Sequence, residues 1–227
     1  MNKTIFITGI STEVGKTLTA AIVTEALSAD YWKPVQAGEL SYSDTHKVKA
    51  MISNTTSVFH SNSYALKTPM SPHAAAQLDG IEIELEAIQP PKTNNKLVIE
   101  GAGGLLVPLN DQHTILDLIQ PSYKVLVVSR HYLGSINHTL MTLELLRQKG
   151  LEVALIFSGE EHPTTESIIK KMTGVEIIGR INEEAHIDKN TILRYANLFR
   201  KKLEQFTMDN EQSCPPKRSE GGGQFNI

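Results

Sequence analysis

The segment TIFITGISTEVGKT, residues 4–17, joins a short apolar run to a turn bounded by two glycines and then to the triplet GKT. This order fits the phosphate-binding loop pattern G-x-x-x-x-G-K-[ST], in which a loop between a strand and a helix surrounds the phosphates of a nucleotide. Five residues instead of four separate Gly9 from Gly15, so the loop is one residue longer than the pattern. An ordinary glycine turn with a solvated lysine is the alternative, but the flanking strand and helix favour a nucleotide site.

The residue types of this loop suit an anion and a divalent cation. Backbone N–H groups in the turn and at the helix N-terminus point toward the phosphates, where the helix dipole also favours negative charge. Lys16 can reach the β- and γ-phosphates, and Thr17 can offer its hydroxyl oxygen to Mg²⁺. The loop therefore predicts binding of a nucleoside triphosphate with its metal ion.

Short apolar runs rich in β-branched residues predict strands that are covered on both faces, as in a parallel sheet. Helical patterns lie between them at 16–28, 136–149 and 189–206. This alternation predicts an α/β fold, a P-loop NTPase-like doubly wound, mainly parallel sheet with helices on both faces. The runs are TIFIT (4–8), KLVIE (96–100), KVLVVS (124–129), EVALIFS (152–158) and VEIIG (175–179).

The whole chain has the composition of a soluble globular protein, with 227 residues, 40% hydrophobic and 21% charged. We expect a single domain over residues 1–206 and a disordered C-terminal tail over 207–227, where polar residues, a Pro pair and a Gly run provide little to bury. The net charge of −3 favours neither nucleic acid nor membrane as a partner. The single Cys214 and the lack of an apolar run of about 20 residues indicate a cytoplasmic protein.

Two acidic residues are candidate ligands for the metal ion. Glu100 ends the apolar run KLVIE and precedes GAGG, whose small residues would let the backbone approach a ligand closely. Ligands of open α/β sheets gather beyond such strand ends, although an acidic residue there could merely cap a turn. Asp44 in SYSDTHKVK is also a good helix N-cap, and local sequence favours that structural role.

Two further segments contain candidate residues that also have a structural interpretation. Lys33 lies in YWKPVQAG, which we expect to carry the second strand to its end, and it could be an ordinary surface lysine. Ser71 and Pro72 suit the start of a helix, and His73 could be structural or catalytic. The histidines of the chain show no zinc-binding spacing.

Six segments taken together resemble dethiobiotin synthetase, an enzyme of biotin synthesis. The resemblance covers residues 1 to about 205, in the family's order, and the family also carries the lengthened loop. No single segment is specific, but the combination is. The segments are GISTEVGKT (9–17), KPVQAG (33–38), SDTHKVK (43–49), TPMSPHAAA (68–76), EGAGGLLVPL (100–109) and LGSINHTL (133–140).

The resemblance implies a ligase reaction that uses ATP and CO₂ as co-substrates and Mg²⁺ as cofactor, without a biotin prosthetic group. CO₂ joins an amine of 7,8-diaminopelargonic acid as a carbamate, ATP phosphorylates the carbamate, and the second amine closes the ureido ring. By the same resemblance, the catalytic residues are Lys16, which bridges phosphate and carbamate, and Lys33, which stabilises the carbamate. The metal ligands are Thr17, Asp44 and Glu100, so the resemblance favours the ligand role of Asp44.

The resemblance also assigns the nucleotide contacts to the loop, to the ends of two strands and to one later loop. It implies binding by Glu13, Val14, Gly15, Lys16, Thr17, Leu18, Asp44, Glu100, Gly101, Ala102, Gly103, Ser158, Gly159 and Asn182.

Substrate binding is implied for both sides of the loop and for the helix that opens at GSIN. In the family this opening binds the substrate's carboxylate across a homodimer interface, so the active site is built from two subunits. An ordinary helix start is the alternative from local sequence. The implied residues are Thr12, Glu13, Lys33, Ala37, Ser71, Gly134, Ser135, Ile136 and Asn137.

The chain departs from the family at three positions that contact ligands. Ser158 followed by Gly159 replaces an Asn that reads the nucleotide base, and Asn182 replaces a Pro in the later base-contacting loop. A serine hydroxyl cannot reproduce the paired donor and acceptor of an amide. Ala37 stands where a hydroxyl residue is common, which removes one substrate contact. Base selectivity is therefore left open.

Two rival functions share the same scaffold. Another ATP-dependent ligase, such as the synthetase half of a cobyrinic-acid amidase, would carry a glutaminase domain with a nucleophilic cysteine, whereas Cys214 lies in the polar tail. A partitioning or positioning ATPase would typically carry a second lysine early in the loop, and GISTEVGKT has none before Lys16. Both features favour the dethiobiotin synthetase reaction.

Overall fold

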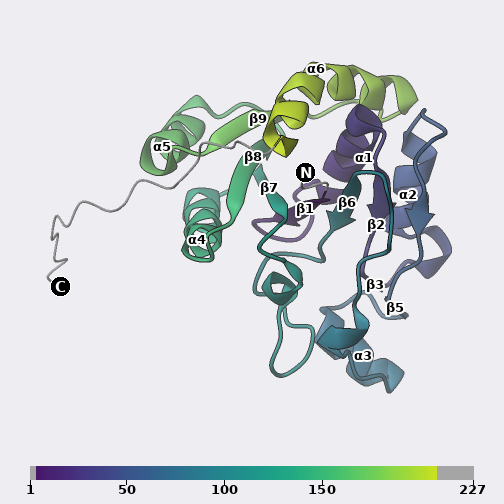
Figure 1. Ribbon diagram of the computed structural model, residues 1–227. Helices are drawn as coiled ribbons and strands as arrows, with labels where there is room; N and C mark the ends of the chain where they lie inside the picture. The colour runs from purple at the N-terminus through teal and green to yellow at the C-terminus, as the bar shows by residue number, and fades with distance from the viewer. Residues whose placement is uncertain (1–3, 209–227) are drawn as a thin grey trace, which may run out of the picture.

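The main sheet of the computed structural model, which describes residues 4–208, has seven strands that are all parallel (Figure 1). Continuous apolar runs form its central strands, which are buried on both faces. The strand order is β4-β2-β6-β1-β7-β8-β9, so that β1 lies at the middle between β6 and β7. The strands are β1 (Thr4–Gly9), β2 (Asp30–Trp32), β4 (Phe59–His60), β6 (Leu97–Glu100), β7 (Lys124–Arg130), β8 (Glu152–Ser158) and β9 (Glu176–Ile181).

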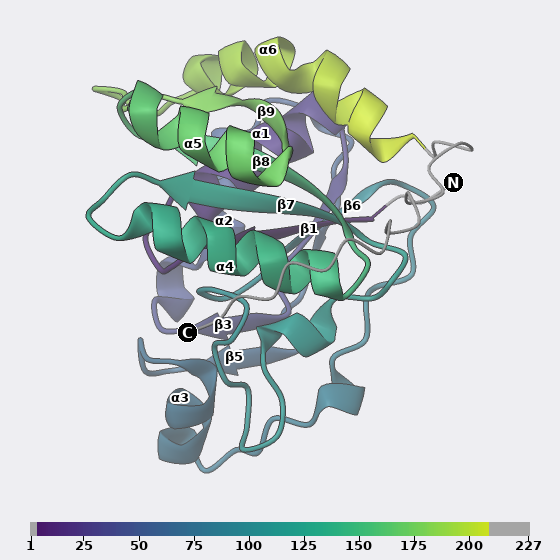
Figure 2. The ribbon, with the colours of Figure 1, turned by 90° about the vertical axis from the view of Figure 1, so that its left-hand side faces the viewer.

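Helices cover both faces of this sheet. On one face α1 packs against α6 and α2, and on the other α4 packs against α5 (Figures 1 and 2). The predicted doubly wound α/β fold is confirmed. The helices are α1 (Lys16–Leu27), α2 (Asp44–Met51), α3 (Pro72–Asp79), α4 (Ser135–Gln148), α5 (Pro163–Thr173) and α6 (Lys189–Thr207).

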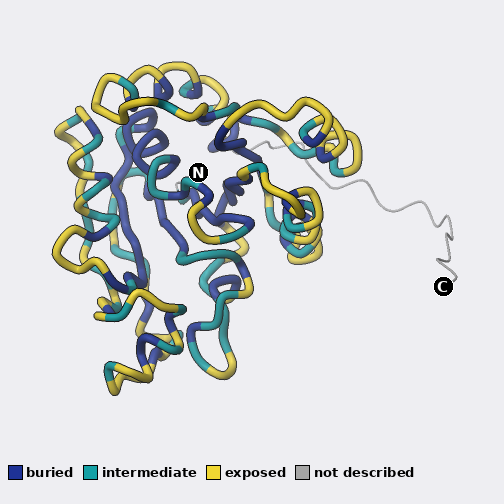
Figure 3. Tube along the Cα trace, turned by 180° about the vertical axis from the view of Figure 1, so that it is seen from behind, coloured by how far each residue is buried: buried dark blue, intermediate teal, exposed yellow. Residues whose placement is uncertain are grey.

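Burial separates the inner elements from the outer helices. The central strands and α1 are buried almost throughout, whereas α4, α5 and α6 turn exposed faces outward (Figure 3). Helix α1 is enclosed by the sheet on one side and by α2 and α6 on the others, which is why it is buried nearly all round. The phosphate-binding loop is therefore anchored at both ends by buried elements.

The chain leaves the main sheet at Lys33 and Pro34, so the second strand does end within YWKPVQAG, as expected. Strand β2 ends at Trp32, and β3 (Val35–Ala37) pairs instead with β5 (Tyr64–Leu66) in a small second sheet. Pro34 has no N–H group and interrupts the ladder, while its carbonyl accepts hydrogen bonds from the amides of Ser63 and Tyr64. Lys33 is consequently held at the edge where the two sheets separate.

The remaining boundaries differ little from the predictions. Helix α6 includes Thr207, which is buried, so the ordered domain extends at least one residue beyond 206. The rest of the predicted tail falls on residues 209–227, which lie outside the described part. Three short 3₁₀ turns complete the fold, at Leu40–Tyr42, Leu85–Ala87 and Ile115–Leu118. Within residues 4–208, none of the helices combines the length and apolarity that a membrane span requires.

Candidate active site

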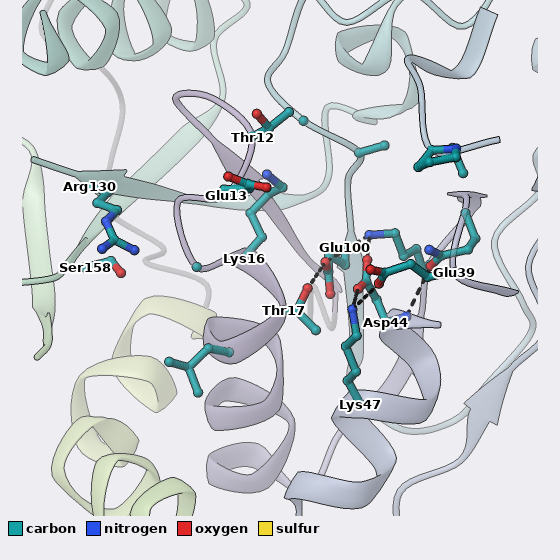
Figure 4. Close-up of a pocket in the computed structure, with 18 of the residues that line it drawn as sticks. Thr12, Glu13, Lys16, Thr17, Glu39, Asp44, Lys47, Glu100, Arg130 and Ser158 are labelled. Atoms are coloured by element: carbon teal, nitrogen blue, oxygen red, sulfur yellow. Dashed lines mark hydrogen bonds and ion pairs between the residues drawn. The ribbon is translucent and has the colours of Figure 1, made fainter. Parts of the chain in front are cut away.

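A pocket of about 1030 Å³ opens at the carboxyl ends of the central strands, around the phosphate-binding loop (Figure 4). This is the edge at which open α/β sheets bind ligands. Most of the residues that sequence reasoning proposed for the site line this pocket. They are Thr12, Glu13, Gly15, Lys16, Thr17, Leu18, Lys33, Ala37, Asp44, Ser71, Glu100, Ala102, Gly103, Ser158, Gly159 and Asn182.

The lengthened loop depends on glycine at both ends. A Cβ on Gly9 would lie 2.7 Å from the carbonyl oxygen of Ser11, and one on Gly15 would lie 2.8 Å from Ser158 Oγ. Gly15 also caps α1 with a φ of 97°, and Glu13 has a φ of 54°. Both values lie in the left-handed region, which is costly for a non-glycine residue such as Glu13. The loop thus folds tightly over the start of α1.

Lys16 is buried in the loop, and its Nζ donates a hydrogen bond to the carbonyl of Ser11 at 3.0 Å. Burial, together with the charge of Lys33, lowers the pKa of Lys16 to about 8, although the charge of Glu100 opposes this shift. The protein thus stabilises the charged form of Lys16 poorly, and an added anion would stabilise it. Lys16 is therefore suited to a phosphate.

Three polar side chains donate hydrogen bonds to Glu100, at the end of β6 (Figure 4). Glu100 Oε1 accepts hydrogen bonds from Thr17 Oγ1 at 2.8 Å and from Lys33 Nζ at 3.0 Å. Its Oε2 accepts one from the hydroxyl of Tyr31 at 2.8 Å. Lys33 Nζ also donates to Asp44 Oδ2, so one ammonium joins the two carboxylates. We call Thr17, Lys33, Asp44 and Glu100 the ionic cluster.

Charges within the ionic cluster offset the cost of burying it. Burial alone would lower the pKa of Lys33, but Glu100 and Asp44 outweigh it and raise that pKa above its ordinary value. Burial alone would raise the pKa of Asp44, but the charge and hydrogen bond of Lys33 hold it below its usual range. Lys33 and Asp44 are therefore both charged at neutral pH.

Asp44 is not the helix N-cap that local sequence favoured. Ser43 occupies that position, and its backbone N–H donates to Nδ1 of His46 at 3.2 Å in a capping box. Asp44 is the first residue of α2, and its backbone N–H donates to Gln36 Oε1 at 3.3 Å. Because Ser43 supplies the cap, the carboxylate of Asp44 is directed to Lys33 and Lys47.

The ionic cluster has the donor set that a Mg²⁺ ion prefers. Magnesium commonly takes one or two carboxylates, and phosphates and water complete its octahedron. Lys33 joins the carboxylates of Asp44 and Glu100, and the hydroxyl of Thr17 is hydrogen-bonded to Glu100, so three residues bring oxygen ligands together. Across residues 4–208 there is no group of three or more His, Cys, Asp or Glu side chains arranged to hold a metal. A metal ion here would consequently need a nucleotide's oxygens as well.

Several proposed residues lie outside this pocket, for structural reasons. Val14 is buried in the main core. A Cβ on Gly101 would lie 3.0 Å from the ring of Phe6, and one on Gly104 would lie 3.3 Å from the carbonyl oxygen of Gly9. These two glycines permit close packing against β1, whereas Ala102 and Gly103 face the pocket.

The segment from Gly134 to Asn137 begins α4, and it lies outside the main pocket. The backbone N–H of Ser135 already donates to the carbonyl of Tyr132 at 2.9 Å, and its side chain is buried. A second pocket of about 430 Å³ separates α4 from the loop. Thr12 and Val107 line both pockets and so connect them.

The end of the main pocket beyond Ser158 contains residues that sequence reasoning missed. Arg130, Glu183, Glu184 and Ile187 line it together with Asn182. On the opposite side, Gln36, Glu39 and Lys47 were also missed, and they line the pocket beside Asp44. The signal for Arg130 was its place at the end of an apolar run next to β1 in the sheet. The signal for Lys47 was its spacing from Asp44, since it follows Asp44 by nearly one helical turn.

Solved structures with the same fold come from the partitioning and positioning ATPases. The chain is similar to a ParA family ATPase from Chlorobium tepidum TLS, with a TM-score of 0.53 and 14% identity over 91% of this chain and 99% of that chain. It is also similar to a chain of the MinC:MinD cell division protein complex from Aquifex aeolicus, with a TM-score of 0.52 and 17% identity over 95% and 99% of the two chains. At such identities the likeness concerns the fold alone and gives no support to a switch function.

Sequence relatives identify the family. A family model described as an AAA domain matches residues 3–191. An ATP-dependent dethiobiotin synthetase from Christiangramia forsetii is 58% identical over 89% of this chain and 99% of its own length. Another from Cytophaga hutchinsonii is 49% identical over 86% and 95%. With such identity over nearly the full length of its relatives, the chain belongs to the ATP-dependent dethiobiotin synthetase family.

Proposed function

We propose that this protein forms dethiobiotin from 7,8-diaminopelargonic acid, CO₂ and ATP. The family supports ATP-dependent dethiobiotin formation by a ligase of biotin biosynthesis. The observation that carries the proposal to this chain is the ionic cluster beside the phosphate-binding loop, in which Lys33 lies between Asp44 and Glu100 and near Lys16. Two cations and two carboxylates in one buried place suit a reaction between two anions and a metal-bound triphosphate.

The triphosphate would lie along the loop from Gly15 toward Glu100. Backbone N–H groups at the start of α1 and the Nζ of Lys16 would bind its oxygens. Thr17, Asp44 and Glu100 would hold Mg²⁺, which when bound neutralises charge on the β- and γ-phosphates. The low pKa of Lys16, about 8, would then rise, because the phosphates replace the weak contact with the Ser11 carbonyl.

The reacting groups would meet between Lys16 and Lys33. One substrate amine attacks the carbon of CO₂ and loses a proton, which gives a carbamate. A carbamate oxygen then attacks the γ-phosphorus. The bond from that phosphorus to the bridging β-phosphate oxygen breaks, and ADP leaves with the electron pair. The second amine attacks the carbonyl carbon, closes the ureido ring and expels phosphate. The positive charges of Lys16 and Lys33 would stabilise the oxygens on which negative charge accumulates.

CO₂ would react with the free amine directly, so the reaction requires no biotin prosthetic group as carboxyl carrier. The diamine would occupy the side of the loop that Thr12 and Glu13 line. Ser71 lines the same pocket from the start of α3, and its side chain makes no capping hydrogen bond among the described residues. Its hydroxyl could therefore supply the polar contact that Ala37 cannot.

We propose further that the active site is completed by a second copy of the chain. Leu133 and Met141 are exposed beside the second pocket's helix, and Leu106 is exposed on the loop across it. Apolar patches of this kind typically mark an interaction surface. In a homodimer, Ile136 and Asn137 of one copy would present backbone N–H groups to the substrate carboxylate bound by the other. The protein would work in the cytoplasm, on a diffusible acid and without a nucleic-acid or membrane partner.

An isotope experiment tests this reaction and its order. The protein is mixed with 7,8-diaminopelargonic acid, ATP, Mg²⁺ and bicarbonate labelled with both ¹³C and ¹⁸O, and the mixture is quenched before the label exchanges with water. Because the attacking carbamate oxygen leaves with the phosphate, we expect ¹³C in dethiobiotin and ¹⁸O in the released phosphate. Labelled dethiobiotin with unlabelled phosphate would contradict the carbamic–phosphoric anhydride.

A further inference from the structure

An ion pair between Arg130 and Glu183 crosses the end of the pocket that lies beyond Ser158. Arg130 ends β7, Glu183 follows β9, and their side chains meet at 2.6 Å above Gly159 at the end of β8. A Cβ placed on Gly159 would lie 3.8 Å from both Arg130 Cγ and Glu183 Oε1. Figure 4 shows Arg130 beside Ser158, on the far side of Lys16 from the ionic cluster. A triphosphate that reaches the cluster would leave its base at this end.

Two backbone N–H groups that could read the edge of a base already have partners here. The backbone N–H of Gly159 donates to the carbonyl of Ile181 at 2.8 Å. That of Asn182 donates to the hydroxyl of Tyr195 at 3.0 Å. Ser158 carries a single hydroxyl, which lies close to Gly15. These groups are therefore poorly placed to distinguish one base edge from another.

We propose that Arg130 is the base-binding residue of this site and that it recognises the face of a nucleobase rather than its edge. The guanidinium group is planar and stacks on aromatic rings, and a carboxylate partner fixes its plane. Every nucleobase has such a face, so binding through it tolerates different bases. Ile187 adds an apolar side chain to the same wall. The inference rests on the proposed nucleotide site and names the residue that serves the base.

The position of this ion pair fits a ligand-binding role better than a structural one. The side chains of Arg130 and Glu183 are 45% and 57% exposed, and exposed pairs contribute little to stability. The pair can therefore adjust to a base at small cost, whereas the neighbouring Glu184 is held by both Arg194 and Tyr195. Arg130 can therefore present its guanidinium plane to the pocket while it stays paired with Glu183.

Calorimetric titration with Mg²⁺ and ATP, CTP or GTP tests this inference on the full chain. We expect the three nucleotides to bind within about tenfold of one another, and Arg130→Ala to weaken each by about tenfold, as for a cation–π contact in a partly desolvated site. Arg130→Lys keeps the charge but loses the plane, so it should bind as weakly as Arg130→Ala. Arg147→Ala is the matched control, because Arg147 also forms an exposed pair, with Glu144 at 2.7 Å, away from this pocket.

Unchanged binding in Arg130→Ala, full recovery in Arg130→Lys, or a loss confined to ATP would overturn the inference. Binding is measured without turnover, so the two proposals can fail separately. If the variants behave as expected while the wild-type protein makes no dethiobiotin, the proposed function fails and the role of Arg130 stands. If dethiobiotin forms while Arg130→Ala binds nucleotide normally, the role of Arg130 fails alone.

Discussion

Lys33 is the residue on which both the stability and the chemistry of the site depend. It is 5% exposed and is the cation that joins Asp44 to Glu100. Without it, two carboxylates would face each other at the end of β6, with Thr17 and Tyr31 as the remaining partners of Glu100 and Lys47 as that of Asp44. Removing one partner of a buried ion pair is costly because the other charge stays buried.

We predict that Lys33→Met lowers the free energy of unfolding by about 3 kcal/mol in the absence of divalent cations. Mg²⁺ should restore part of this loss, because it can replace the ammonium between the two carboxylates. Thermal unfolding with and without Mg²⁺ measures both effects. Lys124→Met is the control, since Lys124 is also a buried lysine and pairs with Glu152 outside this pocket. Equal responses of the two variants to Mg²⁺ would show that the ion binds elsewhere.

Lys16 predicts a pH dependence of nucleotide binding. Its pKa of about 8 in the free protein lies below the ordinary value of 10.5, and bound phosphates favour the charged form. Above pH 8 the protein must take up a proton to bind ATP with a charged lysine. The dissociation constant should therefore be flat below about pH 7 and rise above pH 8 toward tenfold per pH unit.

Calorimetry in buffers of different ionisation enthalpy measures the proton uptake of this step. Lys16→Arg is the informative control, because a guanidinium stays charged throughout the range. Its nucleotide binding should be weaker but independent of pH. A wild-type profile that stays flat to pH 10 would show that Lys16 is fully charged in the free protein.

At the scale of the elements, continuous apolar runs were reliable guides and short or broken ones were not. The strands at 4–9, 97–100, 124–130, 152–158 and 176–181 all follow such runs, because strands inside a parallel sheet are buried on both faces. Sequence reasoning missed α5, since its apolar side chains are few among charges. It also missed β3, which follows Pro34 and forms a strand only through its tertiary pairing with β5.

The packing of α6 on β9 provides a prediction at the same scale. A Cβ on Gly179 would lie 2.3 Å from the ring of Phe199. Helix α6 can therefore pack this closely on β9 only because residue 179 has no side chain. Gly179→Ala should cost about 1–3 kcal/mol in urea unfolding, as overpacked cores do. Phe199→Leu in the same background should recover part of that loss. Additive losses in the double variant would show that the two residues do not interact.

At the scale of the whole molecule, the site is assembled from segments distant in the sequence. Thr17, Lys33, Asp44 and Glu100 come from α1, the β2–β3 connection, α2 and β6, and only the fold brings them together. Local sequence identified Thr17 from the GKT triplet of the loop and Glu100 from its place at the end of an apolar run, whereas Lys33 and Asp44 needed the resemblance to a family. Arg130 and Glu183 were missed because neither belongs to a motif and their pairing is visible only in three dimensions.

The proposed homodimer yields a prediction at this scale. Leu133 is fully exposed next to α4. In a symmetric dimer both copies would carry a glutamate at this position, so the substitution would bury two unpaired charges in the interface. Leu133→Glu should weaken dimerisation by at least about hundredfold, with activity lost in proportion to the monomer fraction. Sedimentation velocity and the dethiobiotin assay at matched concentrations measure this. Leu198→Glu, on the exposed face of α6, should remain dimeric and active. A fully active Leu133→Glu monomer would contradict a shared active site.

The most direct test of the account is the formation of labelled dethiobiotin by the wild-type protein and by Lys33→Met. Both are incubated with 7,8-diaminopelargonic acid, ¹³C-bicarbonate, Mg²⁺ and saturating ATP, and the product is measured by mass spectrometry. We predict ¹³C-dethiobiotin from the wild-type protein and none above background from Lys33→Met, although the variant still binds ATP. Product from Lys33→Met at the wild-type rate, or no product from folded wild-type protein that binds ATP, would contradict the account.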